Sequence, residues 1–207
     1  MDTQRAAEHL QVIRTLMERA ALYRRALAPI MLAVGGVGCA AGACALMHEL
    51  KDMRTFGVYW LAVALGAVAL AFGLARRQAL KDREPFWSPP TRRVAQALLP
   101  ALVSGFCLAV ALTVGNDEEM IALMVLLCLF FYGAAVHAAG FFMPRGMKVF
   151  GWLFIAGGVL LLVGLMAFEL DDLGPQSASA VMGFFFGVLH LGYGLYLRAT
   201  ERPQPVA

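Results

Sequence analysis

The sequence predicts an all-α membrane protein in which six helices cross the bilayer as three hairpins, preceded by a cytoplasmic amphipathic helix. Of the 207 residues, 60% are hydrophobic and 15% are charged, whereas a soluble domain is about half apolar and about a quarter charged. The apolar residues form long runs without Asp, Glu, Lys or Arg, and the basic residues fall in alternate loops. Long uncharged runs predict membrane helices, and the charge of the loops predicts their orientation.

Six uncharged runs of about 20 to 24 residues are long enough to cross roughly 30 Å of hydrocarbon, at a rise of about 1.5 Å per residue. They define one bundle over residues 26–197, followed by a cytoplasmic tail over residues 198–207. The predicted spans are residues 26–47, 55–75, 94–115, 120–142, 149–168 and 177–197.

Residues 1–25 are predicted to form an amphipathic helix on the cytoplasmic side. Apolar residues recur there at helical spacing, while arginine and glutamate occupy the other faces. One interpretation is a helix that binds a partner protein. The other is a helix that lies on anionic lipid with its arginines toward the headgroups. The apolar residues that fall near one face are Leu10, Ile13, Met17, Ala20 and Leu27.

The basic residues orient the predicted spans. All of the 17 lysines and arginines except Lys51 and Arg54 fall in the N-terminal arm, in the loops after the second and fourth spans, or in the tail. Loops rich in lysine and arginine remain in the cytoplasm. We therefore expect both termini in the cytoplasm, with short acidic turns such as residues 116–119 on the opposite side.

The segment EPFWSPPTRR, residues 84–93, ends the main basic loop just before the third span. Its aromatic rings are expected at the level of the headgroups, where such rings anchor membrane proteins, and its arginines belong to the cytoplasmic charge. Ser88 can cap the helix that follows. A proline-rich docking peptide is the alternative interpretation. The predicted membrane-interface anchors are Phe86, Trp87, Arg92 and Arg93.

Together with residues 13–31, IRTLMERAALYRRALAPIM, this segment resembles an uncharacterised group of bacterial multi-pass inner-membrane proteins. The resemblance covers the arm, the first span and the main loop. It implies a location in the bacterial inner (plasma) membrane, and it carries no activity over to any residue of this chain.

Glycines spaced three and four residues apart predict close helix packing, because small residues let helix backbones approach each other. His137 is expected to share a face with the glycines of the fourth span, and His190 with those of the sixth. The predicted packing glycines are Gly38, Gly42, Gly133, Gly140, Gly183, Gly187 and Gly194.

His137 and His190 are the ionisable residues that stand well inside the predicted spans, at similar depth. If the fourth and sixth spans are neighbours, the two imidazoles could meet and bind a b-type haem, which needs two histidines facing one pocket. A metal ion would want a third or fourth ligand, which nothing at that depth supplies, so no metal site is predicted. In the remaining interpretation, each histidine forms a hydrogen bond to a neighbouring helix and no cofactor is bound.

The sequence contains no HExxH, GxSxG or Walker motif to indicate an enzyme or a nucleotide site, and its basic loops require no nucleic acid. We therefore expect a non-enzymatic protein of the inner membrane, embedded in the lipid bilayer, that is a partner-binding, regulatory or structural component of the envelope. A small-solute or ion passage protein is the first alternative. A haem-binding redox subunit built on His137 and His190 is the second.

Overall fold

The chain folds into six long helices in a computed structural model that describes residues 26–48, 50–83, 85–143, 146–168 and 173–200. These residues form helices and turns, with no β-strand among them. All six long helices are apolar enough to cross a membrane, which confirms the predicted all-helical membrane fold. The predicted N-terminal helix over residues 1–25, and the tail beyond residue 200, lie outside the described residues.

Short connections join the helices along the chain. Their bounds are Ala26–Met47 for the first helix, Met53–Lys81 for α2, Pro89–Gly115 for α3, Ile121–Ala139 for α4, Gly146–Ala167 for α5, Pro175–Gly183 for α6 and His190–Thr200 for α7. A 3-10 turn, Glu118–Met120, precedes α4, and a π-helical turn, Phe184–Leu189, joins α6 to α7. Together α6, the π turn and α7 form one continuous helix, Pro175–Thr200, which we call the sixth span.

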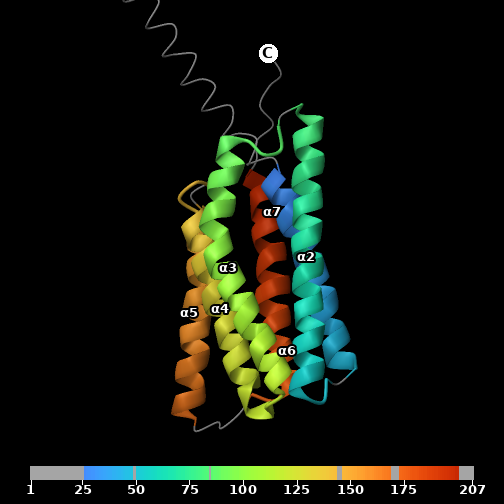
Figure 1. Cartoon of the computed structure of the whole chain (residues 1–207), viewed down its shortest axis with the longest axis vertical. Coiled ribbons are helices and arrows are strands. Elements are labelled where there is room, and N and C mark those ends of the chain that lie inside the picture. The colour runs from blue at the N-terminus through green and yellow to red at the C-terminus, as the bar shows by residue number, and fades with distance from the viewer. Residues whose placement is uncertain (1–25, 49, 84, 144–145, 169–172, 201–207) are drawn as a thin grey trace, which may run out of the picture.

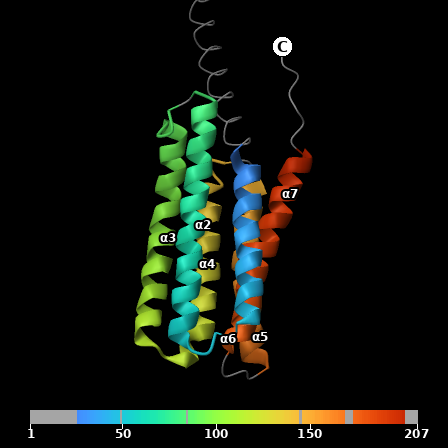
Figure 2. The same cartoon turned by 90° about the vertical axis from the view of Figure 1, so that its right-hand side faces the viewer.

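Successive helices run in opposite directions and are joined at alternate ends of the bundle (Figure 1). α4 packs against both α3 and α5 and also contacts α6. The first helix lies beside α7, as Figure 2 shows, and it accepts a hydrogen bond of 2.6 Å from the Tyr59 hydroxyl of α2 at the Ala41 carbonyl. Because α4 packs against both of its sequence neighbours, the division into three hairpins stays a prediction.

Polar residues cap α2 and α3 where these helices meet. Asp52 precedes α2, and its carboxylate accepts hydrogen bonds from the backbone N–H of Thr55 at 2.7 Å and from the Thr55 hydroxyl at 3.1 Å. These bonds lower the pKa of the Asp52 carboxyl, because they stabilise its charged form. Asn116 ends α3 in the left-handed conformation, with φ of 53°, and its side-chain oxygen accepts a hydrogen bond from the Arg54 N–H at 3.0 Å. The bond between Asn116 and Arg54 ties the end of α3 to the start of α2.

The start of α3 differs from the expectation. Ser88 does precede the helix, but its side chain makes no bond to a backbone N–H. Its hydroxyl meets the Thr91 hydroxyl at 2.9 Å instead. The first two residues of α3 are both prolines, and proline has no N–H, so one of the groups that a capping serine normally reaches is missing.

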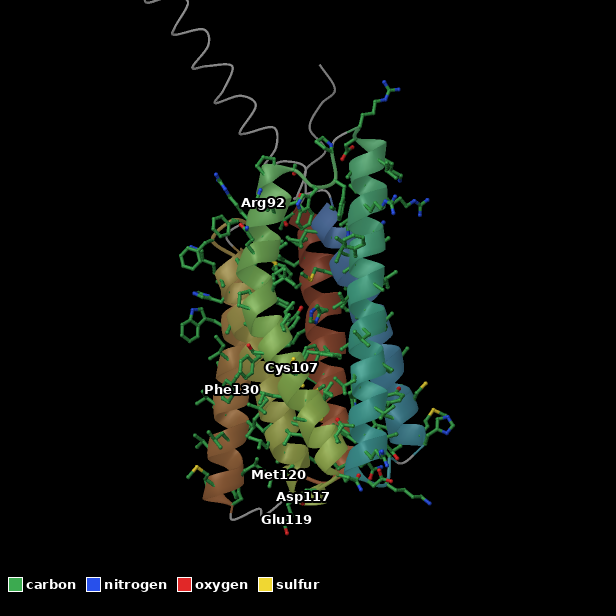
Figure 3. The ribbon with its side chains drawn as sticks, in the orientation of Figure 1. Arg92, Cys107, Asp117, Glu119, Met120 and Phe130 are labelled. Atoms are coloured by element: carbon green, nitrogen blue, oxygen red, sulfur yellow. The ribbon has the colours of Figure 1, made fainter. Side chains whose placement is uncertain are left out.

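Charge distinguishes the two ends of the bundle. Arg92 lies at one end, and Asp117 and Glu119 lie at the other (Figure 3). We call the first the basic end and the second the acidic end. The exposed cations described at the basic end are Arg76, Arg77, Lys81, Arg83, Arg92, Arg93 and Arg198.

The first helix and the sixth span touch through glycines, with Gly38 and Gly42 facing Gly183 and Gly187. We call this contact the glycine seam. A methyl group added at Gly42 would lie 2.8 Å from the Cα of Gly183, and one added at Gly187 would lie 2.6 Å from the backbone nitrogen of Cys39. Two carbon atoms in contact are normally about 3.5–4.0 Å apart. The two backbones therefore approach too closely for any side chain to lie between them.

The other glycines singled out from the sequence lie against two neighbours. Gly194 continues the contact of the sixth span with the first helix. On α4, a methyl group at Gly133 would lie 2.9 Å from the Gly151 carbonyl oxygen, and one at Gly140 would lie 2.8 Å from the Lys148 nitrogen. Both of those neighbours belong to α5, so α4 and α5 also pack with their backbones close together.

The glycine seam can be tested with a single methyl group. Gly42→Ala should lower the free energy of unfolding by about 1–3 kcal/mol, because the added carbon overpacks a backbone contact. Gly36→Ala is the matched control, since a methyl group there has no neighbour within 4 Å and alanine favours the helix by up to about 1 kcal/mol. Unfolding in detergent, followed by circular dichroism, measures both variants. Equal stability of the two would contradict the seam.

Candidate functional site

The His190 side chain is one of the buried polar groups of the bundle. It is 1% exposed and occupies the first position of α7, directly after the π turn. Its Nε2 lies 2.6 Å from the Tyr132 hydroxyl of α4, and its Nδ1 lies 3.1 Å from the Phe185 carbonyl oxygen. Both ring nitrogens therefore have a protein partner, and one of those partners lies on another helix.

These two bonds determine where the proton of the imidazole sits. A carbonyl oxygen only accepts, so Nδ1 must carry the hydrogen that it donates to Phe185. In a neutral ring Nε2 is then the acceptor, and the Tyr132 hydroxyl donates to it. No carboxylate of the described residues is bonded to the ring, so nothing there balances a charged imidazolium. We assign His190 as the neutral Nδ1–H tautomer.

Aromatic rings surround the imidazole. Phe150 and Phe154 of α5 meet it edge-on, with ring centroids 5.0 Å and 5.6 Å away. Phe186 lies nearly parallel to it at 6.2 Å, and the Tyr132 ring is 5.4 Å away. Such an enclosure excludes water, and a hydrogen bond in a medium of low dielectric constant is stronger than one in water.

The π turn changes the direction in which His190 points. A π-helix bonds residue i to residue i+5, so it places more residues in one turn than an α-helix does. The expectation that His190 shares a face with Gly183, Gly187 and Gly194 assumed α-helical spacing, and it is wrong. The three glycines face the first helix, whereas His190 faces Tyr132 and the rings of α5.

His137 has a different environment. Its Nδ1 lies 3.3 Å from the Lys148 carbonyl oxygen at the start of α5. Its ring packs edge-on against Phe141 and Trp152, each with a centroid distance of 5.5 Å. The Lys148 ammonium lies 3.7 Å from the centre of the Phe141 ring. This histidine, like His190, joins its own helix to a neighbour.

The two histidines pack on nearly opposite sides of α5. His137 contacts Lys148 and Trp152, whereas His190 contacts Phe150 and Phe154. Residues two apart on an α-helix point about 200° apart. The fourth and sixth spans are neighbours, as the haem hypothesis required, but α5 stands between the contacts of the two rings.

This geometry does not fit a haem held by His137 and His190. Bis-imidazole ligation needs both rings to face one pocket with a free nitrogen each, and both nitrogens of His190 are engaged. In the part of the chain that the structure describes, no three His, Cys, Asp or Glu side chains lie together as a metal-binding group.

Sequence reasoning missed Tyr132, because it searched the spans for charged groups and histidine only. The signal was present, since a tyrosine in the middle of an apolar run needs a partner for its hydroxyl. It also missed three buried polar atoms that have no hydrogen-bond partner among the described residues: Trp60 Nε1, Ser179 Oγ and Tyr193 Oη. Unpaired buried groups cost about 1–3 kcal/mol each and mark places where water or a solute can be held.

The predicted anchors lie at the basic end. Trp87 is 60% exposed, whereas Phe86 packs edge-on against Phe72 of α2, with 4.8 Å between ring centroids. Arg92 and Arg93 are exposed in the first turns of α3. Phe86 therefore contacts the helix bundle, and the other three side chains are free to meet headgroups.

Comparison with protein-family models, with curated proteins and with solved structures finds no match for this chain. The resemblance to bacterial multi-pass inner-membrane proteins gains no support from these comparisons and stays a prediction.

The bond between Tyr132 and His190 should contribute measurably to stability. Tyr132→Phe keeps the ring but leaves His190 Nε2 without a partner, so the free energy of unfolding should fall by about 1–2 kcal/mol. Tyr196→Phe is the control, because Tyr196 is an exposed tyrosine of the sixth span. It should change the free energy of unfolding little. In a His190→Leu background, Tyr132→Phe should cost much less. Additive effects of the two substitutions in unfolding titrations would argue against the bond.

Proposed function

We propose that this chain is a non-enzymatic integral protein of the bacterial inner (plasma) membrane, and that it binds a protein partner as a regulatory or structural component of the envelope. The observation that carries the proposal is the use of both intramembrane histidines to hold helices together. His190 joins the sixth span to α4, and His137 joins α4 to α5.

Ionisable residues inside a membrane are commonly functional. Whether the ring nitrogens of the two histidines are free or already bonded therefore distinguishes a catalytic role from a structural one. A catalytic acid or base must come within hydrogen-bond reach of its substrate. The ring of His190 is enclosed by aromatic side chains and has both nitrogens bonded, which favours a role in packing. These contacts favour a structural role for the interior of the bundle, and a protein partner would then bind at the surface.

The distribution of charge supports an orientation with both termini in the cytoplasm. The first helix begins and α7 ends at the basic end of the bundle, the end at which a loop joins α2 to α3 (Figure 1). Positively charged loops remain in the cytoplasm. In this orientation the predicted amphipathic helix over residues 1–25 would be cytoplasmic as well, and it is the segment that we propose for the partner.

The partner proposal can be tested by photo-crosslinking in cells. A photoreactive amino acid at Leu10, on the apolar face of the arm, should give a discrete protein adduct, because that face would lie in the interface. The same group at Leu65, which is exposed on α2, is the control and should label lipid. Mass spectrometry of the adducts distinguishes the two. Lipid adducts alone from Leu10 would support the interfacial helix and overturn the partner.

One observation favours the passage of a small solute as a second function. Trp60, Ser179 and Tyr193 place unpaired polar atoms inside the bundle, and they lie on two helices that contribute to its interior. Buried polar atoms that have no protein partner can be satisfied by water or by a solute.

Osmotic swelling of proteoliposomes in glycerol tests this second function. A passage protein should swell faster than protein-free liposomes, and Ser179→Ala should slow the swelling because it removes a buried hydroxyl from the path. Ser104→Ala is the control, since the Ser104 hydroxyl donates to the Pro100 carbonyl of its own helix at 2.8 Å. A rate equal to that of empty liposomes, or equal rates in both variants, would remove glycerol passage through this path from consideration.

A further inference from the structure

Aromatic and basic side chains gather where α4 ends and α5 begins, toward the basic end of the bundle (Figure 1). They are His137 of α4, Phe141 of the following turn, and Lys148 and Trp152 of α5, and we call them the interfacial cluster. His137 lies two residues before the end of α4, and Lys148 lies two residues after the start of α5. Each is therefore about 3 Å along its helix from that end. Because membrane helices end where the hydrocarbon ends, the cluster lies close to the level of the headgroups.

The side chains of the cluster meet at one aromatic ring. The Lys148 ammonium lies 3.7 Å from the centre of the Phe141 ring. The His137 ring meets the same Phe141 ring edge-on, with centroids 5.5 Å apart, and it meets the Trp152 ring at the same distance. Because the ammonium and the imidazole both lie against Phe141, they are close enough to bind a single headgroup together.

Two rings of the cluster are exposed at the surface of the bundle. Phe141 is 64% exposed and Trp152 is 55% exposed, whereas His137 and Lys148 are partly buried. In a membrane the surface of a helix bundle is covered by lipid, and tryptophan is enriched where the hydrocarbon meets the headgroups. A lipid headgroup is therefore the polar group that reaches the cluster from the side.

The polar atoms of the cluster require an anion and a hydrogen-bond donor. Residues 120–168 contain no Asp or Glu, so α4 and α5 supply no carboxylate to the Lys148 ammonium. His137 Nδ1 lies 3.3 Å from the Lys148 carbonyl oxygen and must carry the hydrogen, because a carbonyl only accepts. In the neutral ring Nε2 is then an acceptor, and the described residues place no hydrogen bond on it.

We propose that the interfacial cluster binds the headgroup of an anionic phospholipid that carries a free hydroxyl, as phosphatidylglycerol does. The phosphate pairs with the Lys148 ammonium in a charge-assisted hydrogen bond. The headgroup hydroxyl donates to His137 Nε2. The exposed faces of Phe141 and Trp152 lie against the first carbons of the acyl chains. Lysines at the membrane surface attract anionic lipids in general, and the histidine adds selection for the hydroxyl.

Lipid binding to the purified full chain tests this proposal. The protein, stripped of lipid in a neutral detergent, is titrated with three lipids, and bound lipid is counted by native mass spectrometry. Phosphatidylmethanol has the charge of phosphatidylglycerol but no headgroup hydroxyl, and phosphatidylcholine has no net charge. We expect phosphatidylglycerol to bind about fivefold more tightly than phosphatidylmethanol, which corresponds to about 1 kcal/mol, and phosphatidylcholine to bind least. Equal binding of phosphatidylglycerol and either other lipid would overturn the proposal.

The lysine is tested by removing its charge. Lys148→Gln should abolish most of the preference for phosphatidylmethanol over phosphatidylcholine, because the phosphate loses its cation. Lys81→Gln is the control, since it removes the same charge from the last turn of α2 at the same end of the bundle, and it should preserve that preference. Equal loss in the two variants would show that net charge alone attracts the lipid and would overturn the site.

The histidine is tested with two amides. His137→Asn keeps a donor for the Lys148 carbonyl but has no acceptor at the position of Nε2, so it should abolish the preference for phosphatidylglycerol over phosphatidylmethanol. His137→Gln brings an amide oxygen near that position and should restore part of the preference. An undiminished preference in His137→Asn would contradict a hydroxyl bound at Nε2.

A soluble headgroup distinguishes a lipid from a free phosphate. Glycerophosphoglycerol is the headgroup of phosphatidylglycerol without acyl chains. It should not compete with phosphatidylglycerol for the protein, because it has no chains to lie against the exposed rings. Effective competition by glycerophosphoglycerol would identify a site for a soluble phosphate ester and overturn the lipid.

Discussion

The hydrogen bond from Tyr132 to His190 fixes how the sixth span sits in the bundle. Hydrocarbon offers no partner to a polar group, so a polar side chain inside the bundle is stabilised when another group of the protein bonds to it. The imidazole meets this requirement with a donor to Phe185 and an acceptor to Tyr132. The π turn, Phe184–Leu189, lies between the two helical segments and lets the ring face α4.

Because the His190 ring points away from the glycines, the sixth span contacts the first helix and α4 at the same time. Its glycines lie against the backbone of the first helix, and its histidine lies against α4 and among the aromatic rings of α5. A histidine on the glycine face would have to fit between two backbones that leave no room for a methyl group. Both contacts are possible because the glycines and the histidine lie on different faces of the sixth span. α2, by contrast, has no buried residue from Leu61 to Gln78.

The sequence was sufficient to predict the six membrane helices, because the thickness of the bilayer sets their length and the cost of buried charge keeps the runs free of Asp, Glu, Lys and Arg. It also singled out Gly42, Gly183 and both histidines. It could not predict the direction of His190, since α-helical spacing was assumed through residues 184–189. Nor could it identify which helix each glycine meets, because the same spacing fits any neighbour. Tyr132 was overlooked because a tyrosine in an apolar run looks like one more aromatic ring.

The direct test of this account is the ¹⁵N NMR spectrum of His190 in the full-length protein in lipid. Nitrogen shifts distinguish the two neutral tautomers and the charged ring. We expect the neutral Nδ1–H tautomer, with Nε2 accepting a strong hydrogen bond that is lost in Tyr132→Phe. A proton on Nε2, a charged ring, or a spectrum that Tyr132→Phe leaves unchanged would contradict the hydrogen bond that Tyr132 donates to His190.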